Sequence, residues 1–180
     1  MSIDRRTLRT RQAIRDVFID LLQKKSLNKI SVSEITNAAN IGRGTFYLHY
    51  EDVYSLYEQL VNELLENLVT LFHHAYPEKG SNNFMVLSQK LIDYIEEHAS
   101  LFILLVGQGN EGKMNQRLKK IFIDQVIEIE QIDKSDSTSI IETSFTVSGI
   151  VGVLTDWLTA GMDIDKDYLT RIINTLIQKC

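Results

Sequence analysis

The segment from residue 31 to residue 50, SVSEITNAANIGRGTFYLHY, constrains the fold of this chain most strongly. Ser31 followed by Glu34 forms a capping box, in which each residue satisfies a backbone N–H at the start of a helix. Asn40 and Gly42 tolerate the backbone conformations of a tight turn, which most other residues resist. The segment therefore predicts two short helices joined by a tight turn.

The second of these helices, expected over residues 43–50, sorts its side chains by face. Phe46 and Tyr50 are four residues apart and apolar, so they should pack inward on the first helix. The other face collects the hydrogen-bonding side chains of Arg43, Thr45, Tyr47 and His49. A short helix with one apolar flank and one hydrogen-bonding flank suits the major groove of DNA.

Gly44 lies within the same helix and carries no side chain. Either it lets the backbone come close to a phosphate or a base edge, or it relieves crowding against a neighbouring helix. The sequence leaves both interpretations open.

These residues resemble the helix-turn-helix signature of the TetR family of bacterial transcription regulators. The matching residues are Ile35, Ala39, Ile41, Gly44, Tyr47, Tyr50 and Leu56, and the resemblance covers residues 8–60. It implies an N-terminal three-helix head that binds DNA and a C-terminal helical body for effector binding and dimerisation. It further implies a homodimeric repressor that binds a palindromic double-stranded DNA operator and responds to a small-molecule effector.

The resemblance also suggests roles for single residues. Arg43, Gly44 and Thr45 are expected to face the bases. The residues expected to hold the DNA backbone are Ser33, Thr36, Tyr47, His49 and Arg11. One departure concerns Val53, which stands where the family usually has a phosphate-contacting lysine and follows two acidic residues. This departure implies that other groups anchor the phosphates.

Charge is distributed unevenly along the chain. Residues 1–50 hold nine Lys and Arg against four Asp and Glu, whereas residues 51–180 hold ten against twenty, although the net charge is only −5. Five arginines gather near the start of the chain, at Arg5, Arg6, Arg9, Arg11 and Arg15. Such a cluster is either a solvated helix face or a surface that neutralises phosphates.

Apolar periodicity predicts an all-α protein of about nine helices. No period-two strand pattern with turn residues is present, and the chain has a single proline. Beyond the paired helices, we expect helices at about residues 10–25, 53–75, 83–98, 100–107, 113–132 and 140–160, and a last one containing Leu169 to Ile177. The predicted domains are residues 1–52, which bind DNA, and residues 53–180, which sense ligand and dimerise.

Several classes of protein are not expected. The longest charge-free apolar segment lies between Glu142 and Asp156 and is shorter than the ~20 residues needed to span a bilayer. With one cysteine and no secretion signal, the chain is expected to be cytoplasmic, without a membrane partner. His73 and His74 are adjacent, so they lack the spacing of a helical metal pair. Neither catalysis, a metal nor a cofactor is expected.

The segment of residues 140–160 is apolar on nearly every side, so it should be buried on every side. Gly149 and Gly152 within it would let another backbone come close. Two such C-terminal helices exceed what one small subunit covers, which predicts a two-fold dimer. The residues expected at its interface are Val147, Ile150, Val151, Leu154, Leu158, Ile172 and Leu176. The alternative is that these helices only form the core of a monomer.

An effector pocket is expected between the middle helices. Its candidate lining residues are Tyr94, Phe102, Phe122, Gln125, Phe145 and Trp157. Aromatic residues at helical spacing also form ordinary cores, and no charged cluster identifies a ligand. Two other functions remain open. One is a helical adaptor that contacts another regulator as a coactivator, and the other is a small-molecule-binding protein or enzyme that uses the helical body.

Overall fold

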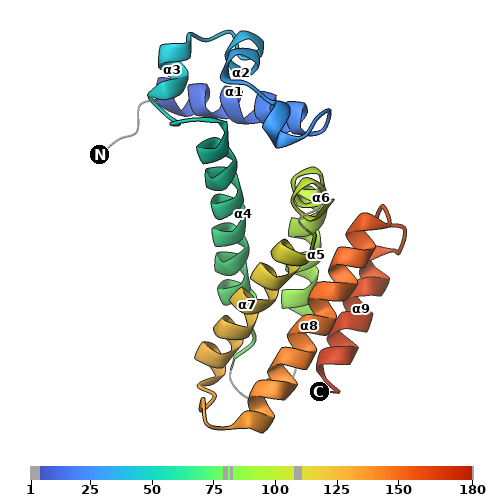
Figure 1. Ribbon diagram of the computed structural model, residues 1–180. Helices are drawn as coiled ribbons and strands as arrows, with labels where there is room; N and C mark the ends of the chain where they lie inside the picture. The colour runs from blue at the N-terminus through green and yellow to red at the C-terminus, as the bar shows by residue number, and fades with distance from the viewer. Residues whose placement is uncertain (1–4, 79–80, 82, 108–110, 180) are drawn as a thin grey trace. The chain divides into compact units, whose positions relative to one another are not determined.

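The computed structural model describes residues 5–78, 81, 83–107 and 111–179, and the regular secondary structure of these residues is entirely helical (Figure 1). The helices are α1 (Arg5–Leu22), the short 3₁₀ helix η1 (Leu27–Lys29), α2 (Val32–Ala38), α3 (Arg43–Tyr47), α4 (Val53–Ala75), α5 (Met85–Glu97), α6 (Ala99–Gly107), α7 (Glu111–Glu130), α8 (Ser137–Thr159) and α9 (Lys166–Ile177). Within the described residues, the prediction of an all-α fold with about nine α-helices is confirmed.

The chain divides into two compact units, residues 1–66 and residues 67–180. The sequence predicts a boundary after residue 52, whereas the contacts place the division inside α4. Leu56, Leu60 and Val61 explain this difference, because they are almost fully buried and belong to the first unit. The first half of α4 therefore completes the core of the first unit, and its last turns belong to the second.

The core of the first unit joins its four α-helices. Ile14 and Phe18 of α1, Ile35 of α2, Phe46 of α3 and Leu56 of α4 are completely buried. Each of these residues lies on the apolar stripe of its helix, so burying the stripes against one another fixes how α2 and α3 sit on α1.

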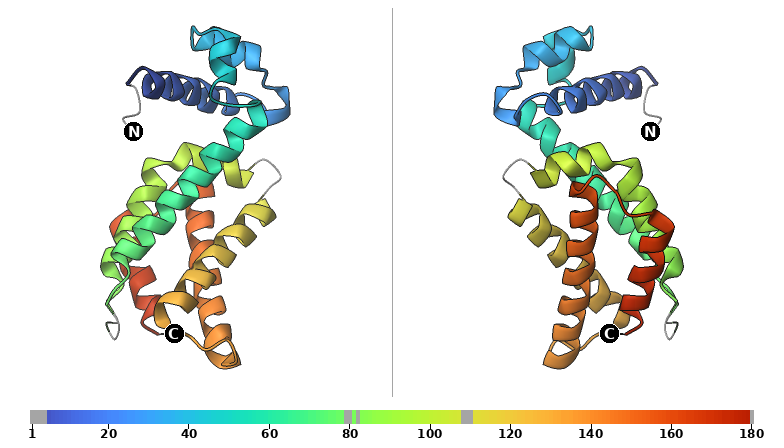
Figure 2. Two further views of the ribbon diagram at one scale, coloured as in Figure 1. Left: turned by 90° about the vertical axis from the view of Figure 1, so that its left-hand side faces the viewer. Right: turned by 90° about the vertical axis from the view of Figure 1, so that its right-hand side faces the viewer.

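The second unit is a bundle in which α7 packs along α8, α5 packs along α9, and α6 contacts both α7 and α8 (Figures 1 and 2). Polar contacts add to the apolar packing. The Lys166 Nζ of α9 forms ion pairs with Asp93 Oδ1 at 3.2 Å and Glu96 Oε2 at 2.8 Å on α5. The Tyr76 hydroxyl donates to Glu130 Oε1 at 2.9 Å, which ties the segment after α4 to the end of α7.

Several helix ends differ from the sequence expectation by a few residues, including the start of α1, the end of α3 and the start of α8. Helix α1 begins at Arg5, so the N-terminal arginines from that residue onward lie on the helix. Helix α3 ends at Tyr47, and Leu48 is its C-cap. Helix α8 begins at Ser137 because the Asp136 carboxylate accepts hydrogen bonds from the first free backbone N–H groups.

Helix α8 also bears on the expectation that the chain has no membrane partner. It has 23 residues, including the acidic Glu142 and Asp156. Among the described residues it is the one helix long and apolar enough to span a membrane. In this structure α8 packs against α7 and α6.

Candidate nucleic-acid interface and ligand cavity

The predicted capping box is present at the start of α2. Ser31 Oγ accepts a hydrogen bond from the Glu34 backbone N at 3.3 Å, and Glu34 Oε2 accepts one from the Ser31 backbone N at 3.0 Å. The turn that follows depends on Asn40, whose φ of 52° lies in the left-handed region. Gly42 is extended, with a φ of −73°, and serves as the N-cap of α3. Together these features fix the first residue of α3 relative to α2.

The Glu34 carboxylate gives the first unit a pH-dependent support. Hydrogen bonds from Lys25 and Ser31 lower the pKa of Glu34 from 4.5 to about 2. A carboxyl group with a lowered folded-state pKa stabilises the fold above its unfolded pKa and loses that contribution as the pH falls towards the folded pKa. We expect Glu34 to titrate near pH 2 in an NMR titration, with α2 losing support between about pH 4.5 and 2. A Glu34 titration near 4.5 would contradict this capping geometry.

Helix α3 carries an exposed outer face over a buried anchor. Phe46 is fully buried beneath it, and Arg43 and Gly44 are exposed. The Arg43 Nη2 donates to Ser33 Oγ at 2.6 Å, so the side chain of α2 orients the guanidinium. A Cβ added at Gly44 would meet nothing within 4 Å, so crowding against another helix does not explain this glycine.

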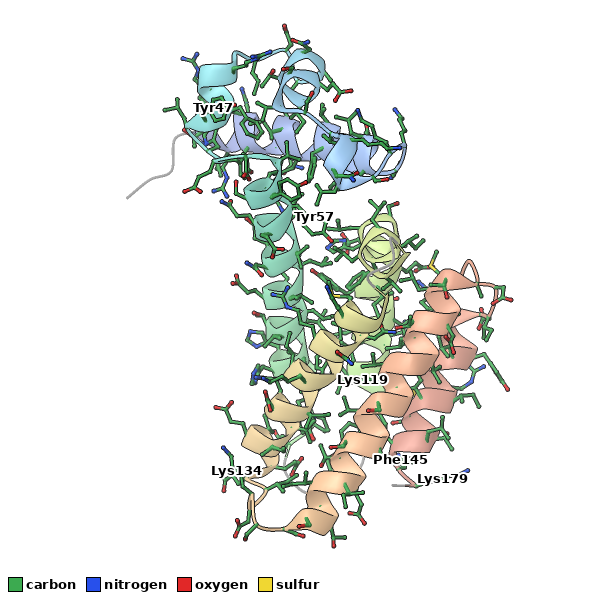
Figure 3. The ribbon with its side chains drawn as sticks, viewed as in Figure 1. Tyr47, Tyr57, Lys119, Lys134, Phe145 and Lys179 are labelled. Atoms are coloured by element: carbon green, nitrogen blue, oxygen red, sulfur yellow. The ribbon has the colours of Figure 1, made fainter. Side chains whose placement is uncertain are left out.

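Two further side chains project from α3 and its C-cap. Tyr47 is 56% exposed (Figure 3), and Leu48 is 82% exposed, the most exposed large apolar side chain of the described residues. Sequence reasoning missed Leu48 because it considered only hydrogen-bonding groups on this face. The available signal was an apolar residue next to Tyr47, off the stripe formed by Phe46 and Tyr50.

Two predicted DNA-contacting residues are engaged within the first unit instead. Thr36 is only 2% exposed and its hydroxyl donates to the Ser33 carbonyl oxygen at 3.2 Å. The Arg11 Nη2 contacts Gln59 Oε1 at 3.4 Å and Glu63 Oε1 at 3.5 Å, and Arg15 pairs with the same Glu63. The contacts of Arg11 and Arg15 tie α1 to the first half of α4.

The remaining predicted contacts lie at the edge of the exposed face. Thr45 and His49 are half-buried, and Ser33 is half-buried while holding Arg43. Val53, which stands where the family usually has a phosphate-contacting lysine, is buried and packs inward. The adjacent Asp52 accepts a hydrogen bond from the Ser55 backbone N at 2.7 Å and caps α4.

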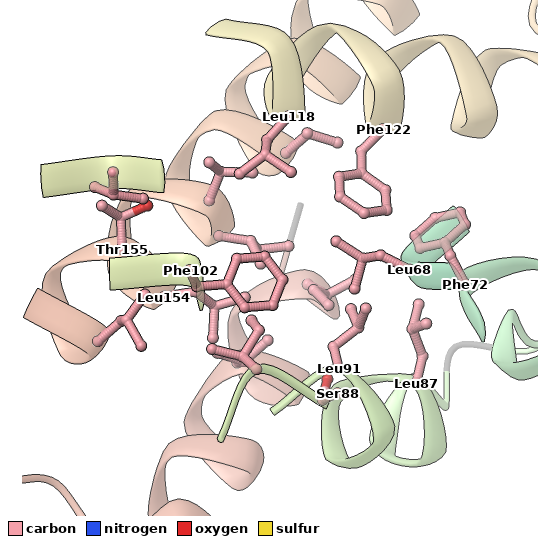
Figure 4. A pocket seen from close by; sticks show the side chains of 18 residues that line it. Leu68, Phe72, Leu87, Ser88, Leu91, Phe102, Leu118, Phe122, Leu154 and Thr155 are labelled. Atoms are coloured by element: carbon pink, nitrogen blue, oxygen red, sulfur yellow. The ribbon is translucent and has the colours of Figure 1, made fainter. Parts of the chain in front are cut away.

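The second unit contains a partly open cavity of about 90 Å³ among α4, α5, α6, α7, α8 and α9 (Figure 4). Its described lining consists of Leu68, Phe72, Leu87, Ser88, Leu91, Ile95, Phe102, Val106, Leu118, Phe122, Val147, Ile150, Val151, Leu154, Thr155, Leu158, Ile173 and Ile177. Sixteen of these eighteen residues are apolar, and none is charged. The described residues also bring together no group of three or more His, Cys, Asp or Glu that could hold a metal ion.

Phe102 and Phe122 are the two predicted ligand-contacting residues that line this cavity. The other four lie elsewhere. Tyr94 packs its ring against His98, with centroids 4.3 Å apart, and Gln125 is hydrogen-bonded to His73. The Trp157 Nε1 donates to the Ile164 carbonyl oxygen at 2.9 Å, and Phe145 is 74% exposed.

The predicted dimer residues divide in a similar way. All five on α8, Val147, Ile150, Val151, Leu154 and Leu158, line the cavity inside the subunit. Ile172 and Leu176 on α9 are exposed. The outward stripe of α8 consists instead of Ile141, Phe145 and Gly149, at intervals of four residues, with Gly152 and Val153 beyond them. The all-round apolar composition of α8 did not reveal which side faces the chain's own core.

These features define a helix-turn-helix protein with a second, helical unit that contains an apolar cavity. A family model described as the C-terminal region of transcriptional regulators, of TetR type, matches residues 82–179. The chain therefore belongs to the TetR family of transcriptional regulators.

Two curated relatives are also transcriptional regulators. YxbF of Bacillus subtilis strain 168, an uncharacterized HTH-type regulator, is 24% identical over 117 residues, which are 63% of this chain but only 30% of YxbF. DhaS of Lactococcus lactis subsp. lactis strain IL1403, an HTH-type transcriptional activator of the dhaKLM operon, is 26% identical over 181 residues, 96% of this chain and 91% of DhaS.

Solved structures show the same fold. NalD, the secondary repressor of the MexAB-OprM multidrug efflux pump in Pseudomonas aeruginosa, has a TM-score of 0.71 at 18% identity, over 96% of each chain. A TetR-like transcriptional regulator from Rhodococcus sp. RHA1 has a TM-score of 0.67 at 16% identity, over 99% of this chain and 97% of that chain.

Proposed function

We propose that this protein is a homodimeric repressor that inserts α3 into the major groove of a palindromic operator and is released by a small-molecule effector. The observation that carries the proposal is the outer face of α3, where Arg43, Tyr47 and Leu48 are exposed above the buried Phe46. Residues at the start of a recognition helix are the ones that meet base edges in helix-turn-helix proteins.

The exposed side chains suit different parts of the DNA. Arg43 has the donor fork that pairs with guanine O6 and N7, and Leu48 offers an apolar surface for a thymine methyl group. Tyr47, His49 and Ser33 can donate to phosphates, and the open backbone at Gly44 permits close approach. Arg5 and Arg9, exposed on α1, replace Arg11 in this proposal as sources of phosphate attraction.

The proposed dimer interface uses the outward stripes of α8 and α9. On α8 the stripe runs from Ile141 through Phe145 to Gly149. A Cβ added at Gly149 or Gly152 would meet nothing within 4 Å, so a partner helix could approach this backbone closely. The α9 stripe consists of Tyr168, Ile172 and Leu176, again four residues apart and exposed. Exposed apolar stripes of this kind mark interaction surfaces.

Effector control is proposed to act through α4. This one helix contributes Leu68 and Phe72 to the cavity lining, and its Glu63 pairs with Arg11 and Arg15 of α1. A ligand shifts the protein away from DNA only if it binds better to the state that cannot bind the operator. Repression needs only occupancy of the operator, whereas activation needs an additional contact with the transcription machinery.

The function is tested by fluorescence anisotropy on DNA from the region around its gene. With six or more phosphate contacts per dimer, affinity should fall about a thousandfold or more between 50 and 200 mM salt. Absence of binding at 50 mM salt, or binding that salt leaves unchanged, would contradict the proposal. A reporter gene under the bound promoter then reads the sign of regulation.

A further inference from the structure

The cavity in the second unit contains one polar group without a partner. Ser88 on α5 is 2% exposed, and its Oγ makes no hydrogen bond to any described residue. Its backbone N donates to the Phe84 carbonyl oxygen at 2.9 Å, so the residue is a regular part of the helix. Figure 4 shows Ser88 on α5 beside Leu91, among the side chains that surround the cavity. Buried hydroxyl groups are nearly always hydrogen-bonded, so this one requires a partner.

The other hydroxyl group of the lining is already engaged. Thr155 Oγ1 on α8 donates to Asn115 Oδ1 at 3.1 Å. The remaining lining side chains are apolar, and three of them are aromatic: Phe72, Phe102 and Phe122. The Phe72 and Phe122 rings lie 5.0 Å apart between centroids and form one wall. The cavity therefore offers a ligand apolar contact on most sides and a free hydroxyl group at Ser88.

The volume of the cavity and the absence of charge among its described lining residues restrict the ligand further. A cavity of about 90 Å³ is of the same order as the ~150 Å³ apolar cavity that holds a benzene ring, so this partly open cavity suits a ligand of about that size. No described lining residue is charged, so an ionised ligand would lose its hydration without gaining a counter-charge. An anion such as a carboxylate is therefore disfavoured relative to a neutral molecule of the same shape.

We propose that the effector is a small, uncharged, mainly apolar molecule of about the size of one aromatic ring, with a single hydroxyl or carbonyl group hydrogen-bonded to Ser88. That this ligand acts as an effector, which controls DNA binding, rests on the proposed function. Ser88 acts as a specificity-determining residue, because it favours a ligand with one polar atom over its hydrocarbon analogue.

Three probes with one shared ring test the chemistry by calorimetry on the full-length protein without DNA: toluene, benzyl alcohol and benzoate. The wild-type chain should bind benzyl alcohol, and benzoate at least a hundredfold more weakly. Ser88→Ala should weaken benzyl alcohol binding about three- to tenfold, the value of one hydrogen bond, and leave toluene binding equal or tighter. Ser88→Thr, which retains the hydroxyl group, should keep the preference for benzyl alcohol.

The matched control is Ser100→Ala, because Ser100 is exposed on α6 and does not line the cavity. It should leave all three affinities unchanged. Benzoate binding as tight as that of benzyl alcohol, an unchanged alcohol preference in Ser88→Ala, or no binding of any probe up to its solubility would each overturn the assignment. Because these measurements omit DNA, a protein that binds the probes but no operator would refute the proposed function and leave the cavity assignment standing.

Discussion

The Arg43→Ala variant is expected to bind operator DNA about thirtyfold to ten-thousandfold more weakly than the wild-type chain, because the dimer loses the contact in both half-sites. Arg43 is the first residue of α3 and is exposed, and its guanidinium is held by Ser33 Oγ at 2.6 Å. Because Ser33 orients the arginine before DNA binds, the side chain loses less conformational freedom when it forms paired hydrogen bonds with a guanine. Removal of one such contact costs ~1–3 kcal/mol per half-site.

The salt dependence of this variant separates two roles for Arg43. If Arg43 contacts a base, the slope of affinity against salt should stay nearly unchanged and specificity should relax at one base position. If it contacts a phosphate, the slope should fall by about one per half-site, hence by about two for the dimer. The matched control is Lys120→Ala, which removes one positive charge from an exposed position on α7. Equal losses in both variants would show that Arg43 contributes only general charge.

The second large effect is expected for the subunit interface. Phe145→Asp should convert a dimer of about twice 20.7 kDa into a monomer in sedimentation experiments. Phe145 is 74% exposed within the subunit, so its replacement leaves the subunit core intact, while a pair of aspartates related by two-fold symmetry would lie in the interface. DNA binding should weaken together with dimerisation, because each half-site would then be bound alone.

Gly149→Leu tests the same surface without introducing a charge. Within one subunit a Cβ added at Gly149 meets nothing within 4 Å, and leucine favours a helix more than glycine does. The variant should therefore stay folded by circular dichroism and lose dimerisation, because the partner helix can no longer approach. Gly112→Leu on α7, equally open in the subunit, serves as the control. A dimer that persists in both Phe145→Asp and Gly149→Leu would place the interface elsewhere.

The local parts of the fold were predictable from the sequence. The capping box of Ser31 and Glu34 is confirmed because its hydrogen bonds join residues only three apart. The bounds of α4 also follow from its regular apolar stripe, which starts at Val53 and ends before Pro77. Such features depend on neighbours in the chain, so spacing alone reveals them.

Contacts between distant residues explain what the sequence did not show. Arg11 faces Glu63 across 52 positions, and no local pattern reveals that this arginine has a partner. On α8, apolar residues occur on every side, so periodicity cannot tell the cavity face of Val151 from the outward face of Phe145. Ser88 did leave a signal, because it interrupts the apolar stripe of α5 between Leu87 and Leu91.

The central claim is that two copies of α3 read one DNA site. Hydroxyl-radical footprinting of the purified protein on fragments selected from the source genome tests this directly. The account predicts an inverted repeat protected over two segments, whose centres lie about one helical turn (~34 Å) or a multiple of it apart. Selection of no fragment, or protection of a single segment without an inverted repeat, would contradict it.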